Sequence, residues 1–385
     1  MKNLLFITSI FLSLNSYAQT FQLSDKSEVS IITCGPGNDE LYEAFGHSAL
    51  RIVDPVQGID VVYNYGMFDL EGPNFYLNFV RGDMLYKLGR YPFNNFLYGY
   101  KLDERWVKEQ ILNLNQEEKQ HFFHYLEDNV IPENASYLYD PYFNNCSSIL
   151  RDLIKKVLVF EGVTKNKNTL RQLMSEEIPW NTWGSFGIHI ALGNKLDKEA
   201  TYEQYMYLPD HLYNSLHEAQ ISKNGTKAPL VKNERTILNF DEKKQKISFL
   251  NPFLIFTLFL LITGFITYKN YKNNTRSKWF DFILFFITGL IGTLIVFLWF
   301  FTNHSTAPNN FNFLWAFAPN LVVSFYMLKN KVPHWINTYT FILLVFLLIL
   351  IIVWILKIQV FSIAVIPILI LLAVRYFYLY KINRN

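Results

Sequence analysis

Acidic residues are nearly missing from the C-terminal part of this sequence, and cysteine is scarce throughout it. Of the 32 Asp and Glu residues in the 385-residue chain, only Asp281 lies after position 248. A segment almost free of acids and rich in Leu, Ile and Phe cannot be an ordinary soluble domain. The net charge of +3 is the sum over an acidic part, residues 1–248, and a basic part, residues 249–385, whose Lys and Arg lie beside apolar stretches. The sequence contains no basic arm, repeat or low-complexity tract. We therefore expect no nucleic-acid partner.

The first eighteen residues have the three parts of a secretory signal. Lys2 precedes the short apolar run Leu4–Leu14, and Ser16-Tyr17-Ala18 suits cleavage before Gln19. The position after the cleavage point is not a cysteine, so the chain is not expected to be a lipoprotein itself. We expect residues 1–18 to be a signal peptide and the next domain to face an oxidising compartment. In such a compartment the only two cysteines, Cys34 and Cys146, could form a disulfide; the alternative is that Cys146 is a free, working thiol.

The C-terminal part contains five apolar stretches, each close to the roughly 20 residues that cross a bilayer as a helix. They are Phe249–Tyr268, Phe280–Phe301, Phe311–Leu328, Asn337–Leu356 and Val360–Tyr380. Lys and Arg gather in the first and third connections and at the C-terminal end, whereas residues 302–310 have none. This alternation predicts an inner-membrane protein with a periplasmic N-terminal domain and a cytoplasmic C-terminus.

Two polar residues of this part have open roles. Asn320 follows Pro319 inside the third stretch; it either packs between helices or lines a lipid groove. The role of His304, in the second connection, stays open.

The region between the signal and the apolar stretches has the mixed pattern of an α+β domain. We assign residues 19–218 to this domain, 219–248 to a linker and 249–385 to a five-helix transmembrane domain. Aromatic-rich Asn74–Tyr100 predicts further strands and turns. The clearest other elements are a strand over Glu28–Cys34 and a short helix over Asp39–Phe45. They are followed by an antiparallel hairpin of His47–Val53 with Val61–Tyr65, and by a capped helix over Asn115–Asn129.

Cys146 opens the most regular helical pattern in this domain. Apolar residues recur along one face from Ile149 to Leu158, and Cys146 lies three, four and seven residues before members of that face. Its side chain should therefore point toward the core or a cleft. A helix N-terminus lowers the pKa of a thiol and offers free backbone N–H groups. Cys146 is thus a candidate nucleophile, with a buried structural cysteine as the alternative.

A base for this thiol has to come from one of several histidines. His47 opens a strand directly after Gly46, and a strand holds an imidazole rigidly. His121 and His124 lie three apart on a helix, but no third ligand follows at metal-binding spacing, so neither a metal nor another cofactor is expected. His47 with Cys146 is the pair that could act together, against a structural His and a buried Cys.

The order of these motifs resembles a known family. A His at the start of a strand hairpin, followed about a hundred residues later by Asn145-Cys146, resembles the circularly permuted papain-like thiol fold of NlpC-type and lecithin:retinol acyltransferase proteins. Ser147-Ser148 departs from that branch, which often has an acid and a His there. A closer similarity is to the Lnb N-terminal periplasmic domain followed by five transmembrane helices. It rests on Thr33-Cys34-Gly35-Pro36-Gly37, Ala44-Phe45-Gly46-His47-Ser48, Tyr63-Asn64-Tyr65-Gly66 and Asn144-Asn145-Cys146 with Arg151-Asp152.

This resemblance implies a lipoprotein N-acyltransferase. Such an enzyme moves an acyl chain from a phospholipid, through a thioester on Cys146, to the α-amino group of a diacylglyceryl-cysteine lipoprotein. His47 would be the general base, and Asn64 would orient its ring, with Tyr63 or Tyr65 as alternatives because the strand register is open. Tyr65, Arg81 and Arg151 are candidate substrate contacts, although a surface ion pair is an alternative role for each arginine.

Two other functions remain open at this point. A membrane-anchored periplasmic cysteine peptidase or amidase acting on peptidoglycan would use the same Cys and His. A non-catalytic membrane chaperone would need neither. The acyl donor, the oligomeric state and the state of Cys34 are not determined by the sequence.

Overall fold

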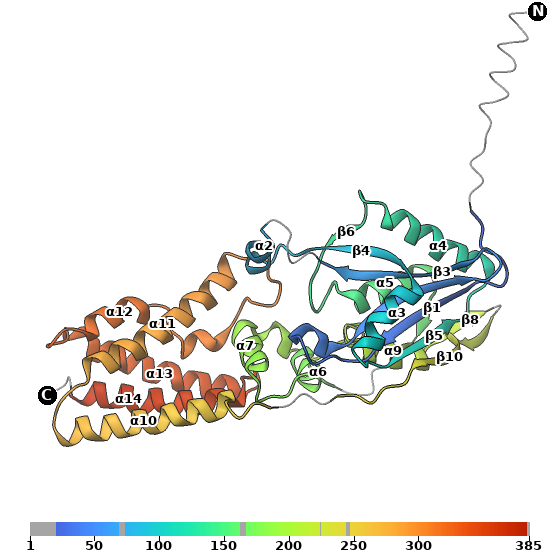
Figure 1. The fold of residues 1–385 in the computed structure, drawn as a ribbon. Helices are drawn as coiled ribbons and strands as arrows, with labels where there is room; N and C mark the ends of the chain where they lie inside the picture. The colour runs from blue at the N-terminus through green and yellow to red at the C-terminus, as the bar shows by residue number, and fades with distance from the viewer. Residues whose placement is uncertain (1–20, 69–73, 162–166, 224, 244–246, 383–385) are drawn as a thin grey trace, which may run out of the picture.

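The computed structural model describes residues 21–68, 74–161, 167–223, 225–243 and 247–382, and the predicted signal peptide lies outside them. It contains a sheet-based N-terminal domain followed by a helical membrane domain (Figure 1). The chain is therefore α+β with an all-α C-terminal part, as the sequence predicted at this level.

Seven strands form the main sheet of the described N-terminal domain, in the order β10-β5-β1-β2-β3-β4-β6. Every pair of neighbouring strands is antiparallel. The strands are β1 Glu28–Cys34, β2 His47–Asp54, β3 Ile59–Met67, β4 Leu85–Pro92, β5 Val107–Leu112, β6 Ser136–Leu138 and β10 Val231–Leu238. A smaller sheet contains β7 Phe160–Glu161, β8 Gln220–Lys223 and β9 Thr226–Pro229.

Helices cover both faces of the main sheet. Three of them, α4, α5 and α9, bury Leu50, Ile52 and Tyr63 on one face, while α3 packs on the other face around Ala49 and Val62. The helices of this domain are α2 Phe75–Arg81, α3 Phe93–Leu102, α4 Gln116–Val130, α5 Cys146–Val157, α6 Leu170–Glu177, α7 Trp183–Ala191, α8 Tyr202–Tyr205 and α9 Pro209–Glu218, with 3-10 turns η1 Leu41–Phe45 and η2 Asn194–Asp197.

Local sequence signals explain why these elements form where they do. The side chain of Asp54 accepts hydrogen bonds from the N–H groups of Val56 and Gln57, which closes the turn between β2 and β3. Asn115 accepts from the N–H of Glu118 and its own N–H bonds the Glu118 carboxylate, so α4 begins with a capping box. The predicted strand at β1, the β2–β3 hairpin and the helix after Asn115 are confirmed.

Two predictions about this domain are corrected by the structure. Residues 219–248 are not simply a linker, because they contain β8, β9 and β10, and β10 pairs with β5 in the main sheet. Residues 74–100 hold a single strand, β4, between the helices α2 and α3. Both regions depend on partners far away in the chain, which a local pattern does not reveal.

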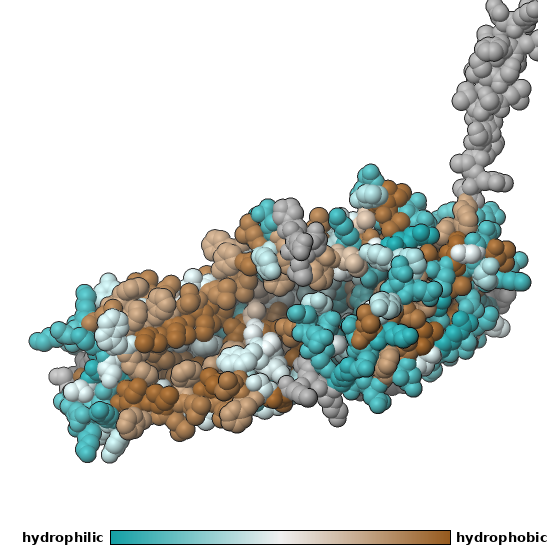
Figure 2. All heavy atoms as spheres, viewed as in Figure 1, coloured by the Kyte–Doolittle hydropathy of each residue, from teal (hydrophilic) through white to brown (hydrophobic). Residues whose placement is uncertain are grey.

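The membrane domain has four long apolar helices among its described residues. Figure 2 shows apolar surface along the flank of this bundle and polar surface at the end away from the sheet domain. The helices are α10 Pro252–Lys272, α11 Lys278–Phe300, α13 Trp335–Ile355 and α14 Ile366–Ile382, the last preceded by the 3-10 turn η4 Ile363–Val365.

The third predicted span is not one continuous helix. Residues 311–328 form the 3-10 turn η3 Phe311–Leu314 and the short helix α12 Asn320–Met327, because Pro319 stands at the helix start. This segment packs tightly along α11, where a Cβ on Gly289 would lie 2.0 Å from the backbone nitrogen of Leu321. Its rings contact α11 near both ends of that helix, Phe313 against Trp299 and Phe325 against Phe282.

Polar residues inside the bundle bond to one another. Asn320 is fully buried and forms hydrogen bonds with Thr288, Tyr339 and Tyr376 from three other helices. Of the two roles considered for Asn320, these bonds favour packing between helices over lining a lipid groove. Arg375 is buried as well, and its Nε lies 2.6 Å from Asp281. The single acid of this part of the sequence therefore has an internal ionic partner.

Candidate functional site

Cys146 is the first residue of α5, and Asn145 fixes the start of this helix. The Asn145 side chain accepts from the N–H of Ser148 at 2.9 Å, and its amide group donates to the carbonyls of Pro141 and Tyr207. The Ser148 hydroxyl accepts from the N–H of Asn145, which completes a capping box. Cys146 is half-buried against the core beneath the sheet, as its place on the apolar face of α5 predicted.

His47 is the first residue of β2, and Gly46 makes its position possible. Gly46 has φ +68°, and a Cβ there would lie 2.7 Å from the carbonyl oxygen of Cys34, so the chain can turn this closely only at glycine. Ser48 follows His47 and shares a 3.0 Å hydrogen bond with Ser147, both hydroxyls being buried. This bond ties the start of β2 to the start of α5.

Asn64, on the partner strand β3, contacts the imidazole of His47. Its Oδ1 lies 2.5 Å from Nε2 of His47. An amide oxygen only accepts, so Nε2 carries the proton that is shared with Asn64. The other ring nitrogen is left for Cys146, and the charge of Cys146 raises the pKa of the imidazole. The three residues Cys146, His47 and Asn64 therefore lie in one connected chain of contacts.

The pKa values of the thiol and the imidazole move in opposite directions. Burial alone raises the pKa of Cys146, but the charge of His47 and hydrogen bonds from His47, the Ser48 N–H and Ser147 lower it from 9.0 to about 7. Burial lowers the pKa of His47, yet the charge of Cys146 and the hydrogen bonds with Cys146 and Asn64 raise it above 6.5 overall. These shifts favour a thiolate–imidazolium pair near neutral pH.

The second cysteine is not linked to the first. Both Cys34 and Cys146 are free thiols, so the disulfide alternative is not realised. Burial raises the pKa of Cys34 to about 12, although a hydrogen bond with Tyr100 opposes this. Cys34 is fully buried and its pKa is raised, whereas the pKa of Cys146 is lowered, which favours the reactive thiolate form of Cys146.

The three predicted substrate contacts lie in different surroundings. Tyr65 is buried in the core with its ring against Tyr137. The guanidinium of Arg151 is held by the Asp152 carboxylate at 2.7 Å and by the carbonyl oxygen of Glu203. Arg81 is exposed at the end of α2 and has a 3.3 Å ion pair with Asp83. Of the three, only Arg81 presents its charge to the surface.

Several residues around the pair carry no signal in the sequence. Arg105 is buried, donates to the carbonyl oxygen of Gly35 at 2.8 Å, and its charge opposes protonation of His47. Ser147, which departs from the permuted papain-like pattern, bonds Ser48 instead. A single sequence does not reveal these partners, because each bond joins residues far apart in the chain.

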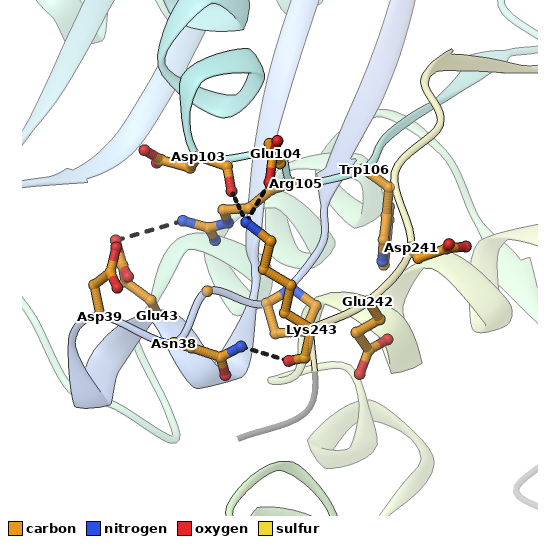
Figure 3. Close-up of a pocket in the computed structure, with 12 residues that line it drawn as sticks. Asn38, Asp39, Glu43, Asp103, Glu104, Arg105, Trp106, Asp241, Glu242 and Lys243 are labelled. Atoms are coloured by element: carbon orange, nitrogen blue, oxygen red, sulfur yellow. Dashed lines mark hydrogen bonds and ion pairs between the residues drawn. The ribbon is translucent and has the colours of Figure 1, made fainter. Parts of the chain in front are cut away.

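A small polar pocket of about 50 Å³ lies near η1 (Figure 3). Its cations are already paired, Arg105 with Glu43 at 3.6 Å and Lys243 with Glu104 at 2.6 Å. No predicted site residue lines this pocket. Among the described residues no group of three or more His, Cys, Asp and Glu side chains is placed to hold a metal ion. The contacts around Cys146 therefore define the candidate site.

The loop that leads to Cys146 touches the membrane domain. Asp140 and Asn144 pair through their backbones just before α5, and the Asp140 carboxylate accepts a hydrogen bond from Ser305, in the loop after α11. Lys195 lies over the ring of Phe143, 4.2 Å from its centroid, and also donates to the carbonyl oxygen of Ser305. The thiol is thus positioned close to the end of the helical bundle.

A buried ion pair at the same junction fixes the two domains together. Arg171 and Asp197 are almost fully buried and 2.8 Å apart, and Asp197 also accepts from the backbone N–H of Val360. Asn312 of the membrane domain donates to the carbonyl oxygen of His189. The sheet domain therefore has a defined orientation on the bundle.

Comparison with known proteins gives two family matches that together cover most of the chain. Residues 14–185 match the family described as Lnb N-terminal periplasmic domain, and residues 243–385 match the Lnb transmembrane domain. No curated protein and no solved structure matches.

Proposed function

Because this chain belongs to the Lnb family of membrane proteins with a periplasmic domain, we propose that it is a lipoprotein N-acyltransferase. The observation that carries the proposal is the contact chain Cys146–His47–Asn64 at the membrane-facing end of the periplasmic domain. The acyl donor is a phospholipid of the outer leaflet of the inner membrane. The acceptor is the α-amino group of a diacylglyceryl-cysteine lipoprotein.

In the first half-reaction the Cys146 thiolate attacks an ester carbonyl of the phospholipid. The tetrahedral intermediate collapses with cleavage of the ester C–O bond, and His47 donates its proton to the departing oxygen. The products are a lysophospholipid and a thioester on Cys146. A lowered thiol pKa and a raised imidazole pKa supply both the nucleophile and the acid for this step.

In the second half-reaction the lipoprotein amine attacks the thioester. His47, now neutral, accepts a proton from the amine, the C–S bond breaks and Cys146 leaves as the thiolate. The products are the amide-linked lipoprotein and the free enzyme with its ion pair restored. Asn64 keeps the imidazole in the tautomer that both halves need, because its oxygen accepts from Nε2.

The start of α5 is the proposed oxyanion site. The N–H groups of Ser148 and Ile149 are bonded to Asn145, which leaves those of Cys146 and Ser147 for the developing oxyanion. Each such donor is typically worth about 3 kcal/mol in the transition state. We assign the lipid phosphate to Arg81, because its guanidinium is exposed at the end of α2. The ion pair of Arg151 and the burial of Tyr65 favour positioning roles for these two residues.

A test in cells separates this function from its alternatives. Mass spectrometry of lipoprotein N-termini should show loss of the third acyl chain when the gene is deleted in a strain without another N-acyltransferase. The wild-type gene should restore it and the Cys146→Ala variant should not. Unchanged triacylation would overturn the proposal. A changed peptidoglycan fragment profile with normal lipoproteins would support the peptidase alternative, and full function of Cys146→Ala would support a chaperone.

A further inference from the structure

Helix α2 presents apolar side chains outward. It has no buried residue, and Tyr76, Leu77, Phe79 and Val80 are all exposed, Tyr76 to 73%. Figure 1 shows α2 at the edge of the sheet domain, beside the end of α11. A short helix with this composition is unfavourable in water and favourable at a lipid surface.

The end of α2 is joined to the membrane domain. The backbone N–H of Asn303 donates to the carbonyl oxygen of Arg81 at 2.7 Å, and the Asn303 side chain donates to Asp83. Gly82 packs so closely on the backbone of His304 that a Cβ would lie 2.7 Å from its nitrogen. The end of α2 is therefore held against the loop that follows α11, at the end of the bundle.

A continuous row of aromatic rings, the first exposed and the other four half-buried, leads inward from α2. We define this aromatic row as Phe79, Phe75, Phe68, Tyr86 and Tyr139. The centroids of successive rings are 6.4, 5.9, 5.0 and 4.3 Å apart, and each pair is stacked. Stacked rings in contact offer an apolar surface that an acyl chain can follow.

The inner end of the aromatic row belongs to the loop that leads to the candidate nucleophile. Tyr139 directly precedes Asp140, and Asp140 pairs with Asn144 two residues before Cys146. The charge of Cys146 is among the causes that, after burial, raise the pKa of Tyr139. The row therefore runs from the exposed apolar face of α2 to the loop that leads to the thiol.

We propose that α2 inserts into the outer leaflet and that the aromatic row is the path along which the phospholipid acyl chain reaches Cys146. The proposal deepens the proposed function and rests on it for the identity of the donor. Its occupant is an acyl chain of a glycerophospholipid. The ester to be cleaved is then held at the thiol while the chain lies on the rings.

Photo-crosslinking tests the location independently of the chemistry. The full-length Cys146→Ala protein is placed in phospholipid vesicles with p-benzoylphenylalanine at Tyr76 or Tyr86, and adducts are read by mass spectrometry. The matched control carries the same probe at Tyr98, an exposed position on α3. Phospholipid adducts at Tyr76 and Tyr86 but not at Tyr98 support the proposal. Equal labelling at all three positions, or none at Tyr86, overturns it.

A donor-length comparison tests the path in the active protein. Thioester formation is measured with a long-chain and a short-chain water-soluble phospholipid for the wild type, Phe68→Ala and Tyr86→Ala. The long-to-short rate ratio should fall at least about tenfold in both variants, the usual effect of losing an aromatic contact. Tyr98→Ala should keep the wild-type ratio.

The two proposals fail in different ways in this experiment. An unchanged ratio in Phe68→Ala and Tyr86→Ala, with normal wild-type thioester, overturns the path and leaves the acyltransferase standing. Absence of thioester from the wild type with either donor overturns the proposed function instead. Crosslinking to lipid at Tyr86 without thioester would then show a lipid site of another purpose, which contradicts the path as an acyl-donor route.

Discussion

Replacing His47 should strongly reduce the reactivity of Cys146 at neutral pH. The charge of His47 and its hydrogen bond are the two largest contributions that lower the pKa of this thiol, while burial works in the opposite direction. In His47→Ala the burial remains and both contributions of His47 are gone, while the hydrogen bonds from the Ser48 N–H and Ser147 stay. The pKa of Cys146 should therefore rise from about 7 toward its ordinary value of 9.0.

The size of the effect follows from the thiolate fraction. With a pKa of about 7, about half of the Cys146 side chains are ionised at pH 7, and with a pKa of 9.0 only about 1% are. Alkylation proceeds through the thiolate, so the rate at pH 7 should drop by up to about 50-fold. Because the thiol pKa is lowered in the wild type, its reactivity persists from high pH down to about 7 and is lost below that.

The assay is the rate of iodoacetamide labelling of the full-length protein against pH, with the labelled cysteine identified by mass spectrometry. Cys34 serves as an internal control, since burial raises its pKa to about 12 and it should stay unlabelled. His121→Ala, which removes an exposed histidine on α4, is the matched control and should behave as the wild type. A wild-type midpoint near that of a free cysteine, or the same profile in His47→Ala, would refute the pairing.

Three further variants test the surroundings of the site. Asn64→Ala should slow thioester formation by about 10- to 100-fold, the loss of a charge-assisted hydrogen bond of about 1.5–3 kcal/mol; an unchanged rate would remove Asn64 from the account. Asp197→Leu leaves the buried Arg171 unpaired and should lower stability by about 3–5 kcal/mol, seen as a lower Tm in detergent, whereas replacing both partners by apolar residues should recover most of it. Gly289→Val should destabilise by about 1–3 kcal/mol through overpacking against Leu321. The same change at Gly264, which has open space around it, should have little effect on Tm, and equal losses would contradict the close packing.

Elements with a strong local pattern could be predicted from the sequence. The strand ending at Cys34, the hairpin begun by His47 and the helix begun by Cys146 each carry their own periodicity, turn residues and cap. Since His47 and Asn64 belong to one hairpin, their contact depends on a short-range register. The sequence left that register open, and the structure places Asn64 on the ring.

Contacts between distant segments could not be predicted in this way. β10 follows β5 by more than a hundred residues yet pairs with it, so its sequence looked like part of a linker. The sequence of the loop after α11 indicated only its lack of Lys and Arg and an unassigned His304, but Asn303 and Ser305 in this loop hold the two domains together. Arg375 lies among the basic residues near the C-terminal end of the sequence, and its buried partner Asp281 is 94 residues earlier, in α11. A single sequence gives periodicity but no information on which distant faces meet.

The most direct test of the central claim is the intact mass of the protein after incubation with phospholipid and without acceptor. The account predicts a mass increase of one acyl group that maps to Cys146, is removed by hydroxylamine and does not form in Cys146→Ala or His47→Ala. Release of lysophospholipid with no acyl group on Cys146, or an acyl group that forms equally well without His47, would contradict it.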